Sequence, residues 1–212
     1  MELESKIDED MRMYYPRTLK KRWFEISEQF PVLLLTGPRQ VGKATFLKHI
    51  AEKERRYVSF DDPDARLLAS EDPAMFFRRY APPVLIDEIQ YAPNIMPYIK
   101  MQVDEDRTGG MFWLTGSQQF AMMKGISESL AGRVAIMNIL GFSGEERRRR
   151  QADVPAFIPE PGQLEKRQNS IETADNIYTD IWQGSFPALV SGDIKDWDIF
   201  YSSYLRTYLE RD

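Results

Sequence analysis

The first two thirds of this chain alternate between short runs of consecutive apolar residues and stretches with the spacing of helices. Apolar runs without a polar residue at every second position are typical of strands that are buried on both faces of a parallel sheet. Such strands are predicted at VLLLT (32–36), YVSF (57–60), PVLIDE (83–88), MFWLT (111–115) and RVAIMNIL (133–140).

Helices are predicted between these strands. A helix that ends before Pro31 is indicated by apolar residues spaced at +4, +3 and +4, which are Leu19, Trp23, Ile26 and Phe30. Further helices are expected over 44–53, 64–70 and 73–80, the last with Asp72 as its cap. Strands that alternate with helices predict an α/β fold, in which helices cover both faces of a five-stranded parallel sheet.

The character of the sequence changes after Gly141. The next segment is charged and contains several prolines, which predicts a boundary helix and a linker, and the end of the chain is helical again. We expect four parts, which are an N-terminal extension (1–16), the α/β domain (17–146), a basic helix end with a linker (147–168) and the start of an incomplete helical domain (169–212).

The loop between the first strand and its helix, GPRQVGK (37–43), has the spacing G-x-x-x-x-G-K. Glycines let the main chain wrap so that successive N–H groups converge on phosphate oxygens, while the helix N-terminus adds positive charge and the lysine reaches the outer phosphates. We predict that this loop binds the phosphates of a nucleotide; a simple glycine turn is the alternative. The predicted phosphate-binding run, with Arg39 and Gln40 interpreted as packing or rim residues, is Gly37, Pro38, Arg39, Gln40, Val41, Gly42, Lys43, Ala44 and Thr45.

Two carboxylates close the third predicted strand. Asp87 is placed to hold the water shell of Mg²⁺ beside the β- and γ-phosphates, and Glu88 is placed to orient and deprotonate an attacking water. The alternative is that an Asp-Glu pair simply ends a strand. Because the phosphate loop lies upstream, we predict Asp87 as the metal-binding residue, and Glu88 and Lys43 as catalytic residues.

Ser117 and Arg133 are further candidates for the catalytic site. Ser117, with Gln118 beside it, follows the fourth strand, where a hydroxyl can sense the γ-phosphate; a turn or capping role is the alternative. Arg133 follows Gly132, and its guanidinium is expected to neutralise transition-state charge in its own site or in a neighbour's. A structural ion pair is the alternative for Arg133.

Ala44 departs from the usual pattern of such loops, which place Ser or Thr after the lysine as a direct Mg²⁺ ligand. Thr45 lies about 100° further round the helix and therefore points elsewhere. Mg²⁺ requires oxygen ligands but readily keeps water molecules, so that a water can fill the position. We expect nucleotide binding to persist, with weaker coupling to Mg²⁺ and slower turnover.

Composition narrows the classes of function. Cysteine is absent, which removes disulfides, thiolate metal sites and cysteine nucleophiles, and the only histidine, His49, is interpreted as an ordinary helix-face residue. The net charge of −5 argues against a surface built for general nucleic-acid binding, and the arginine run 147–150, next to Glu145 and Glu146, is interpreted as a solvated helix. The acidic N-terminus and the lack of an apolar run near ~18 residues predict a cytoplasmic protein without a membrane partner.

These motifs resemble those of AAA-type ATPases of bacteria and archaea that carry a C-terminal domain of unknown function. The resemblance covers residues 13–142 densely and the tail in patches, through YYPRTL, FPVLLLTGPRQVGK, FDDPDAR, VLIDEIQYAP, FWLTGSQQFAMMKGISESLAGRV, WQGSFPAL and YLRTYLERD. It implies a three-layer P-loop NTPase fold with a catalytic glutamate on an added central strand, bound ATP and Mg²⁺, and ATP hydrolysis. Family members usually carry Thr at the position of Ala44. In the family, YYPR lies close to the nucleotide base, which suggests Tyr15 and Arg17 as neighbours, although packing at a helix start is their favoured role.

The last predicted helix carries a stripe of apolar and aromatic residues spaced at +3, +4, +3 and +4, which are Ile194, Trp197, Tyr201, Tyr204 and Tyr208. Such a stripe must be buried against something. We predict that the chain is a fragment or a shortened product, whose last helix packs on the ATPase core or on another chain. A small local core is the alternative.

Three functions stay open from the sequence. The first is an ATPase that forms ADP and phosphate and couples nucleotide state to its C-terminal domain or to a partner chain, which Asp87 and Glu88 favour. The second is a nucleotide-binding switch with little hydrolysis, which Ala44 favours. The third and least favoured is a DNA-associated motor or loader, which is supported only by the arginine run Arg147–Arg150. An oligomer is compatible with all three.

Overall fold

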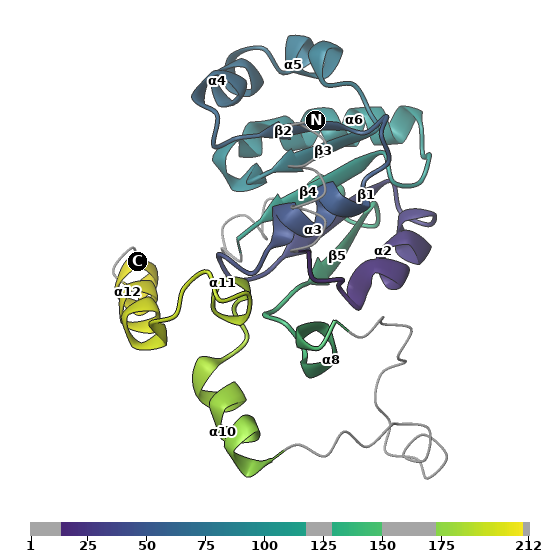
Figure 1. Ribbon diagram of the computed structural model, residues 1–212. Coiled ribbons are helices and arrows are strands. Elements are labelled where there is room, and N and C mark those ends of the chain that lie inside the picture. Colours follow the sequence, from purple (N-terminus) through teal and green to yellow (C-terminus); the bar gives the residue numbers. More distant parts are fainter. Residues whose placement is uncertain (1–13, 118–128, 150–172, 210–212) are drawn as a thin grey trace, which may run out of the picture. The chain divides into compact units, whose positions relative to one another are not determined.

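A computed structural model describes residues 14–117, 129–149 and 173–209 of the chain (Figure 1). The chain divides into two compact units, a larger one of Leu19–Leu140 and a smaller one that combines Met1–Thr18 with Gly141–Asp212. This division lies inside the predicted domain bounds of 17 and 146, because both ends of that stretch pack with the smaller unit.

The larger unit contains a parallel five-stranded sheet in the order β2-β3-β4-β1-β5. Its strands are β1 (Val32–Thr36), β2 (Arg56–Ser59), β3 (Val84–Asp87), β4 (Phe112–Gly116) and β5 (Val134–Asn138). All five predicted strands are present, with bounds that differ at some ends. β4 lies between β1 and β3. The resemblance implied a catalytic glutamate on an added central strand, whereas Glu88 directly follows β3 and not the inserted strand β4.

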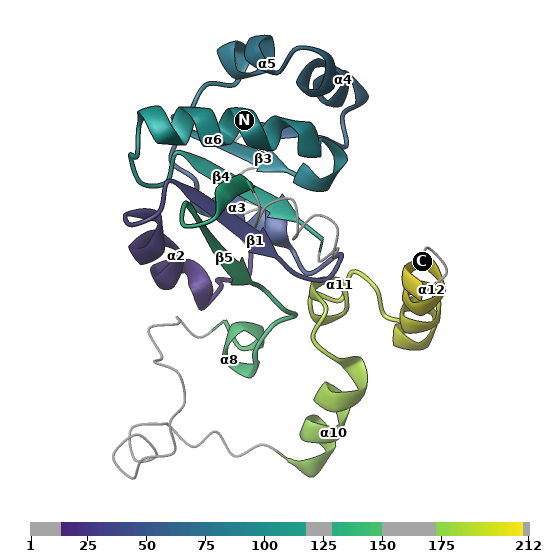
Figure 2. The same cartoon turned by 180° about the vertical axis from the view of Figure 1, so that it is seen from behind.

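Helices cover both faces of this sheet (Figures 1 and 2). Trp113 of β4 packs on Trp23 with ring centroids 5.4 Å apart, whereas the preceding Phe112 packs on Phe77 at 5.9 Å. Successive side chains of a strand point to opposite faces, so that these two contacts lie on opposite sides of the sheet. One side carries α2 (Leu19–Ser27) and α3 (Lys43–Ile50), and the other carries α4 (Pro63–Glu71), α5 (Pro73–Arg79), η1 (Ile89–Tyr91), η2 (Pro93–Ile95) and α6 (Met96–Glu105). The chain therefore has the predicted three-layer α/β/α fold.

The three adjacent strands β1, β3 and β4 form the centre of the core, because every one of their residues is buried. On the side of α6, a single apolar cluster joins Val32, Leu34 and Phe112 to residues of the surrounding helices. Each of these side chains is fully removed from water, which stabilises the fold by roughly 1.5–3 kcal/mol per large apolar residue. The sheet is therefore a rigid platform for the loops at its edge.

Two predictions about helix ends can be compared with the structure. Asp72 caps α5, since its carboxylate accepts a hydrogen bond from the Met75 amide at 2.9 Å, as predicted. The helix predicted over 44–53 begins one residue earlier, at Lys43, and ends at Ile50, because Ala51 takes an extended conformation.

The smaller unit is helical after Gly141, with α8 (Gly144–Arg147), α10 (Ala174–Gln183), α11 (Pro187–Val190) and α12 (Trp197–Leu209). Phe186, just before α11, packs on Tyr201 and Tyr204 of α12 with ring centroids 5.9 and 4.9 Å apart. Trp182 of α10 lies 5.5 Å from Trp197. These contacts match the alternative of a small local core for the aromatic stripe; the side chain of Tyr208 lies outside the described residues.

Two charged residues of α8 are not solvated, contrary to our interpretation of the arginine run and its acidic neighbours. Glu146 is 3% exposed, and Arg147 donates hydrogen bonds to the carbonyls of Asp180 and Gly184 and to the Asp180 carboxylate. The basic run therefore helps to hold α10 in the smaller unit. Arg150 and most of the predicted linker lie outside the described residues.

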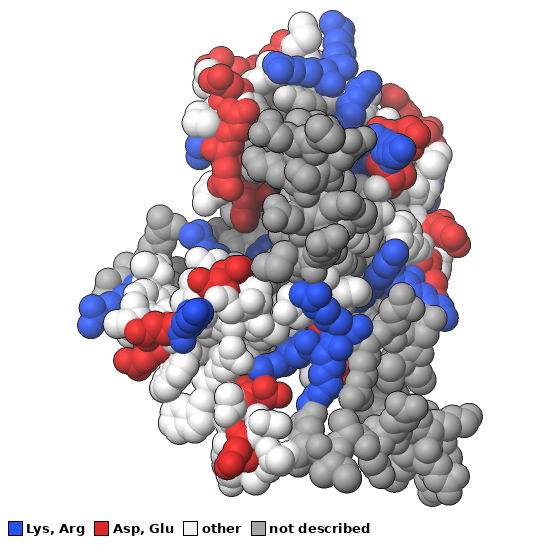
Figure 3. Space-filling view, viewed as in Figure 1, with Lys and Arg blue, Asp and Glu red and all other residues white. Residues whose placement is uncertain are grey.

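Surface charge in the larger unit is mixed. On the face drawn in Figure 3, Lys and Arg side chains are interspersed with Asp and Glu over this unit. The described residues of the larger unit therefore form no strongly basic stripe, the electrostatic signature of general nucleic-acid binding, on that face. None of the helices that the structure describes is long and apolar enough to cross a membrane.

Candidate functional site

The predicted loop and the predicted carboxylates lie at one edge of the sheet. Parallel strands end on the same edge, and the pairing of Thr36 with Gly116 aligns the end of β1 with the end of β4. Gly37 and Ser117 therefore follow neighbouring strand ends, and Asp87 closes β3 on the other side of β4. Tertiary structure has brought together segments that are far apart in the sequence.

Loop 37–43 needs its first glycine for two reasons. Gly37 has a φ of 151°, which side chains disfavour, and a Cβ atom there would lie 2.1 Å from the carbonyl oxygen of Ile139. The main chain of the residue after β5 therefore packs directly against the loop. Gln40 and Gly42 also have positive φ, of 61° and 86°, so that the loop turns sharply before α3 begins.

The N-terminus of α3 presents main-chain donors to this turn. The first hydrogen bond along the helix runs from the Phe46 amide to the Gly42 carbonyl, at 2.9 Å. The amides of Lys43, Ala44 and Thr45 therefore precede the first intrahelical donor and have no intrahelical acceptor. Together with the helix dipole, they favour an anion.

Lys43 folds back over the loop. Its ammonium donates to the carbonyl oxygens of Gly37 at 3.0 Å and Pro38 at 2.8 Å, and the residue is 6% exposed. Burial lowers the pKa of Lys43, while the negative charges of Glu88 and Asp87 act in the opposite direction. A buried cation whose described hydrogen-bond partners are two neutral carbonyls is well suited to accept an anion.

Asp87 is held from two sides. One carboxylate oxygen accepts a hydrogen bond from the Thr115 hydroxyl, and the other accepts one from the Tyr57 hydroxyl at 3.2 Å. Burial, together with the charge of Asp87, raises the pKa of Tyr57, so that this phenol stays a donor at neutral pH. Each carboxylate oxygen keeps a further lone pair for a water or a cation.

Glu88 has a conformation that is unusual for a residue with a side chain. Its φ of 57° and ψ of 49° are left-handed, and its main-chain amide donates to the Thr115 hydroxyl at 3.1 Å. The side-chain amide of Gln90 donates to the Glu88 carboxylate. Non-glycine residues in this conformation concentrate at functional sites, because the surroundings must hold them there.

Ser117 is 6% exposed, and its hydroxyl has no hydrogen-bond partner among the residues that the structure describes. Buried hydroxyls are normally bonded, so one that is aimed at no described partner at a strand edge is a candidate ligand contact. Gln118, its predicted companion, lies outside the described residues.

Arg133 is the predicted site residue that the fold does not bring to this cluster. It precedes β5, and its carbonyl accepts from the Val32 amide, which places it at the opposite edge of the sheet from Gly37, roughly 17 Å away along the strand. Its guanidinium pairs with Asp104 at 2.6 Å and lowers the pKa of that carboxyl. The structural ion pair is therefore present, a role within the same site has no geometric support, and a role in a neighbour's site stays a prediction.

Ala44 and Thr45 differ in exposure. Ala44 is half-buried beside the lysine and offers no oxygen, whereas Thr45 is exposed on α3. Among the described residues there is no group of three or more Asp, Glu, His or Cys side chains that would bind a metal by themselves. A cation at this edge would therefore depend on Asp87, on water and on ligand oxygens, a donor set that fits Mg²⁺.

Tyr15 and Arg17 pack within the smaller unit, in the role that the sequence favoured for them. The Arg17 guanidinium lies 3.4 Å from the Glu146 carboxylate, and both side chains are almost fully buried. Tyr15 stacks on Phe142 with ring centroids 4.8 Å apart. The Glu146 carboxylate also accepts from the main chain of Thr18 at 2.7 Å.

The sequence analysis assigned no individual role to three residues that surround the carboxylates, namely Tyr57, Gln90 and Thr115. Gln90 falls within a motif of the resemblance, but nothing assigned it a contact. Thr115 offered a weak signal, as the only hydroxyl in an otherwise apolar strand. Tyr57 offered none, because its contact with β3 arises from strand pairing between β2 and β3.

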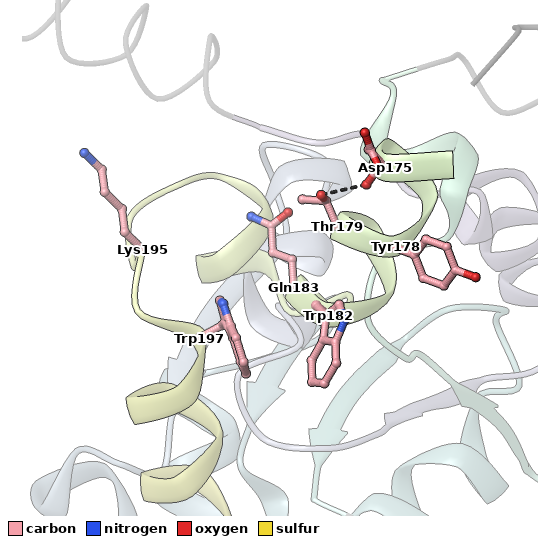
Figure 4. A pocket seen from close by; sticks show the side chains of 7 residues that line it. All are labelled: Asp175, Tyr178, Thr179, Trp182, Gln183, Lys195 and Trp197. Carbon is pink, nitrogen blue, oxygen red and sulfur yellow. Dashed lines mark hydrogen bonds between the residues drawn. The ribbon is translucent and has the colours of Figure 1, made fainter. Parts of the chain in front are cut away.

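The smaller unit has a separate cavity of about 720 Å³ (Figure 4). Figure 4 shows the rings of Trp182 and Trp197 side by side at its wall, with Tyr178 on the next turn of α10. Its lining residues come from α10, from the segment before α12 and from Trp197 at the start of α12, and none of them is a predicted site residue.

Comparisons with known proteins agree with this geometry. Residues 29–147 match the model of a family described as AAA domain. Two uncharacterized proteins, of Mycobacterium bovis and Mycobacterium tuberculosis, are 30% identical over 185 residues, which is 86% of this chain and 36% of theirs. The chain thus spans about a third of the length of these curated relatives.

A solved structure shows the same fold. The Walker-type ATPase PABY2304 of Pyrococcus abyssi superposes with a TM-score of 0.53 at 16% sequence identity, covering 92% of this chain and 72% of that one. At this sequence identity, the structural similarity supports a shared fold only. The family match covers more than half of the chain, and the chain therefore belongs to the AAA domain family, with a P-loop fold.

Proposed function

We propose that the chain binds ATP at loop 37–43 and hydrolyses it to ADP and phosphate. The observation that carries the proposal is the meeting of Lys43 and the first amides of α3 with Asp87 and Glu88 at one edge of the sheet. Donors for phosphate and carboxylates for water chemistry are the two components that phosphoryl transfer to water requires.

Phosphate binding is assigned to the loop and to Lys43. The amides at the start of α3 would donate to phosphate oxygens, and the Lys43 ammonium would exchange its two carbonyl partners for the outer phosphates. This exchange is favourable because a charge-assisted hydrogen bond to an anion is stronger than one to a neutral carbonyl. Ser117 supports the assignment, since its buried hydroxyl has no described partner and follows the adjacent strand.

Asp87 is the residue that would hold Mg²⁺, through water molecules. The ion supplies neutralisation of charge on the β- and γ-phosphates. Thr115 and Tyr57 keep the Asp87 carboxylate in one orientation for this task. Ala44 offers no hydroxyl, so that the protein contributes fewer direct ligands than loops with Ser or Thr do.

Glu88 is assigned as the general base. Its carboxylate would accept a proton from the attacking water. For this, the side-chain amide of Gln90, which now donates to the Glu88 carboxylate, would have to move away or leave one carboxylate oxygen to the water. Arg133 has no part in this site, and a contribution to the site of a neighbouring copy is part of the proposal only if the chain assembles. Coupling of the nucleotide state to the helical unit or to a partner chain, and a cytoplasmic location, remain predictions from the sequence.

Phosphate release by the wild type and by Glu88→Gln tests the proposal. We expect the variant to bind ATP with unchanged affinity and to lose at least about 100-fold in rate, because the base contributes about 10²–10⁴-fold. Glu105→Gln, which changes an exposed carboxylate at the end of α6, is the matched control and should keep the wild-type rate.

A nucleotide-binding switch is the second candidate, and the missing oxygen at Ala44 favours it. In that case ATP binds to both proteins, and the wild type releases phosphate no faster than Glu88→Gln. Failure of both proteins to bind ATP would overturn the proposal and this alternative together.

A further inference from the structure

We propose that Thr115 is a positioning residue, whose hydroxyl joins Asp87 and Glu88 into one rigid pair. The inference rests on the proposed function, because it concerns the orientation of the two carboxylates to which that function assigns roles. Thr115 itself is not expected to touch nucleotide or metal.

The contacts of Thr115 use the one hydrogen of its hydroxyl and one of its two acceptor positions. The oxygen donates its only hydrogen to the Asp87 carboxylate and accepts a hydrogen bond from the Glu88 amide at 3.1 Å. The residue is completely buried in the middle of the sheet, so that no water competes for these bonds. A single atom therefore links the side chain of one predicted functional residue to the main chain of the next.

The location of β4 makes this link available. β4 pairs with β3 up to Leu114 and Ile86, and both strands separate at the following residues, Thr115 and Asp87. The Glu88 amide therefore lies beyond the paired part of β3 and β4, and it donates its hydrogen bond to the Thr115 hydroxyl. This hydrogen bond helps to hold Glu88 in its left-handed conformation. A residue with a side chain disfavours that conformation unless its surroundings stabilise it.

Tyr57 and Gln90 complete the arrangement without replacing Thr115. Tyr57 holds the other oxygen of Asp87, and Gln90 holds the carboxylate of Glu88. Each of these contacts fixes one carboxylate alone. Among the residues that the structure describes, the Thr115 hydroxyl alone fixes both residues relative to each other. It does so from a strand that ends one residue before the candidate phosphate sensor Ser117.

Two variants, Thr115→Val and Thr115→Ser, distinguish an effect of the Thr115 hydroxyl on the two carboxylates from an effect of side-chain packing. Valine keeps the shape of the side chain but removes the hydroxyl, whereas serine keeps the hydroxyl and loses a methyl group. Loss of a hydrogen-bond partner behind a metal-binding or catalytic group usually lowers metal affinity or activity about 10–100-fold. We expect Thr115→Val to lower kcat by that factor, with KM for ATP within about threefold, and Thr115→Ser to retain most of the rate.

Val103→Ala is the control for stability, because Val103 is a fully buried core residue of α6 outside the candidate site. It should lower the thermal midpoint without changing kcat or the Mg²⁺ requirement. Equal kcat and an equal Mg²⁺ requirement in wild type and Thr115→Val would overturn the proposal. A Thr115→Ser variant as impaired as Thr115→Val would overturn it too, since packing would then be the cause.

A second readout keeps this test independent of hydrolysis. Binding of a fluorescent ATP analogue is titrated with Mg²⁺ for each variant, and Thr115→Val should need about 10-fold more Mg²⁺ to reach the same affinity. If the wild type is no faster than Glu88→Gln, the proposed hydrolysis fails, but this titration still decides about Thr115. An unchanged Mg²⁺ requirement in that case would overturn the positioning role.

Discussion

The ammonium of Lys43 donates a hydrogen bond of 3.0 Å to the carbonyl oxygen of Gly37, the first residue of the same loop. The lysine thus closes the loop on itself, and two carbonyl dipoles, with the carboxylates nearby, compensate for the removal of its charge from water. An incoming phosphate would take over these partners. The loop is therefore preorganised, because its lysine needs only a local movement to meet an anion.

Nucleotide affinity should fall as the pH rises above neutrality. Burial lowers the pKa of Lys43 from 10.5, and a bound phosphate would favour the ammonium and raise this pKa again. The protein with a protonated Lys43 binds the nucleotide more tightly. Affinity is therefore highest at pH values below the pKa of Lys43 in the free protein, and it falls with rising pH until the pKa of Lys43 in the complex is passed. Titrations of a fluorescent ATP analogue between pH 7.5 and about 10 would measure this fall.

Lys43→Met is the control for this pH dependence. Loss of a charge-assisted hydrogen bond, at about 1.5–3 kcal/mol, should weaken binding about 10–100-fold at neutral pH and leave a flat profile above it. Lys53→Met removes an exposed lysine after the same helix and should keep both affinity and profile. A pH profile of Lys43→Met that parallels the wild type would assign the titration to another group.

Ala44→Thr should strengthen the requirement for Mg²⁺. A hydroxyl placed directly after Lys43 can replace one water of the ion, which should lower the half-saturating Mg²⁺ concentration about 10-fold in nucleotide binding. Thr45→Ala removes the exposed neighbouring hydroxyl and should have no effect. The interpretation of this position is wrong if Thr45→Ala, rather than Ala44→Thr, changes the Mg²⁺ dependence.

Gly37→Ala should disable the loop by a steric clash. The added Cβ would lie 2.1 Å from the Ile139 carbonyl oxygen, so the end of β5 or the loop must move. We expect a loss of more than about 3 kcal/mol in unfolding free energy, or a folded protein without nucleotide affinity. Chemical denaturation and nucleotide titration distinguish the two results.

Gly132→Ala provides the comparison for Gly37→Ala. Gly132 also has positive φ, of 73°, but nothing lies within 4 Å of its added Cβ. Only conformational strain of about 1–2 kcal/mol is expected there, with unchanged nucleotide affinity. Equal effects at the two glycines would show that the clash at Ile139 is relieved at little cost.

Glu146→Ala should destabilise the smaller unit. The buried carboxylate pairs with Arg17 and accepts hydrogen bonds from Thr18 and Ser143, so its removal leaves a buried guanidinium and several donors without their acceptor. Breaking such a pair costs about 3–5 kcal/mol. Glu25→Ala breaks an exposed pair with Arg22 and should cost less than about 1 kcal/mol, as measured by urea denaturation. A similar cost for both variants would contradict this role of Glu146.

Local sequence patterns were sufficient for much of the fold. The apolar runs located β1 to β5, and the glycine spacing located the loop before α3, because these features depend on neighbours in the chain. The order of the strands in the sheet could not be predicted from these local patterns. The position of β4 between β1 and β3 came from the structure, since periodicity carries no information about which strands pair and the family resemblance implied only an added central strand.

Charged residues with distant partners were predicted less well. The local pattern of Glu146 and Arg147 indicated a solvated helix, yet their partners Arg17 and Asp180 come from remote parts of the chain. Arg133 was placed by its neighbour Gly132, but strand direction decides at which edge of the sheet it lies. Burial of a charge depends on what packs over it, and no short stretch of sequence states that.

The sequence by itself determined the strands, the sharp glycine loop and the residue types that suit phosphate and water chemistry, because backbone preference and hydrophobic period act over a few residues. Tertiary structure alone decided that Tyr57 and Thr115 hold Asp87, that Thr115 also holds Glu88, and that Arg133 lies at the far edge. The physical reason is that hydrogen bonds and ion pairs between separate strands exist only after the sheet has set their register.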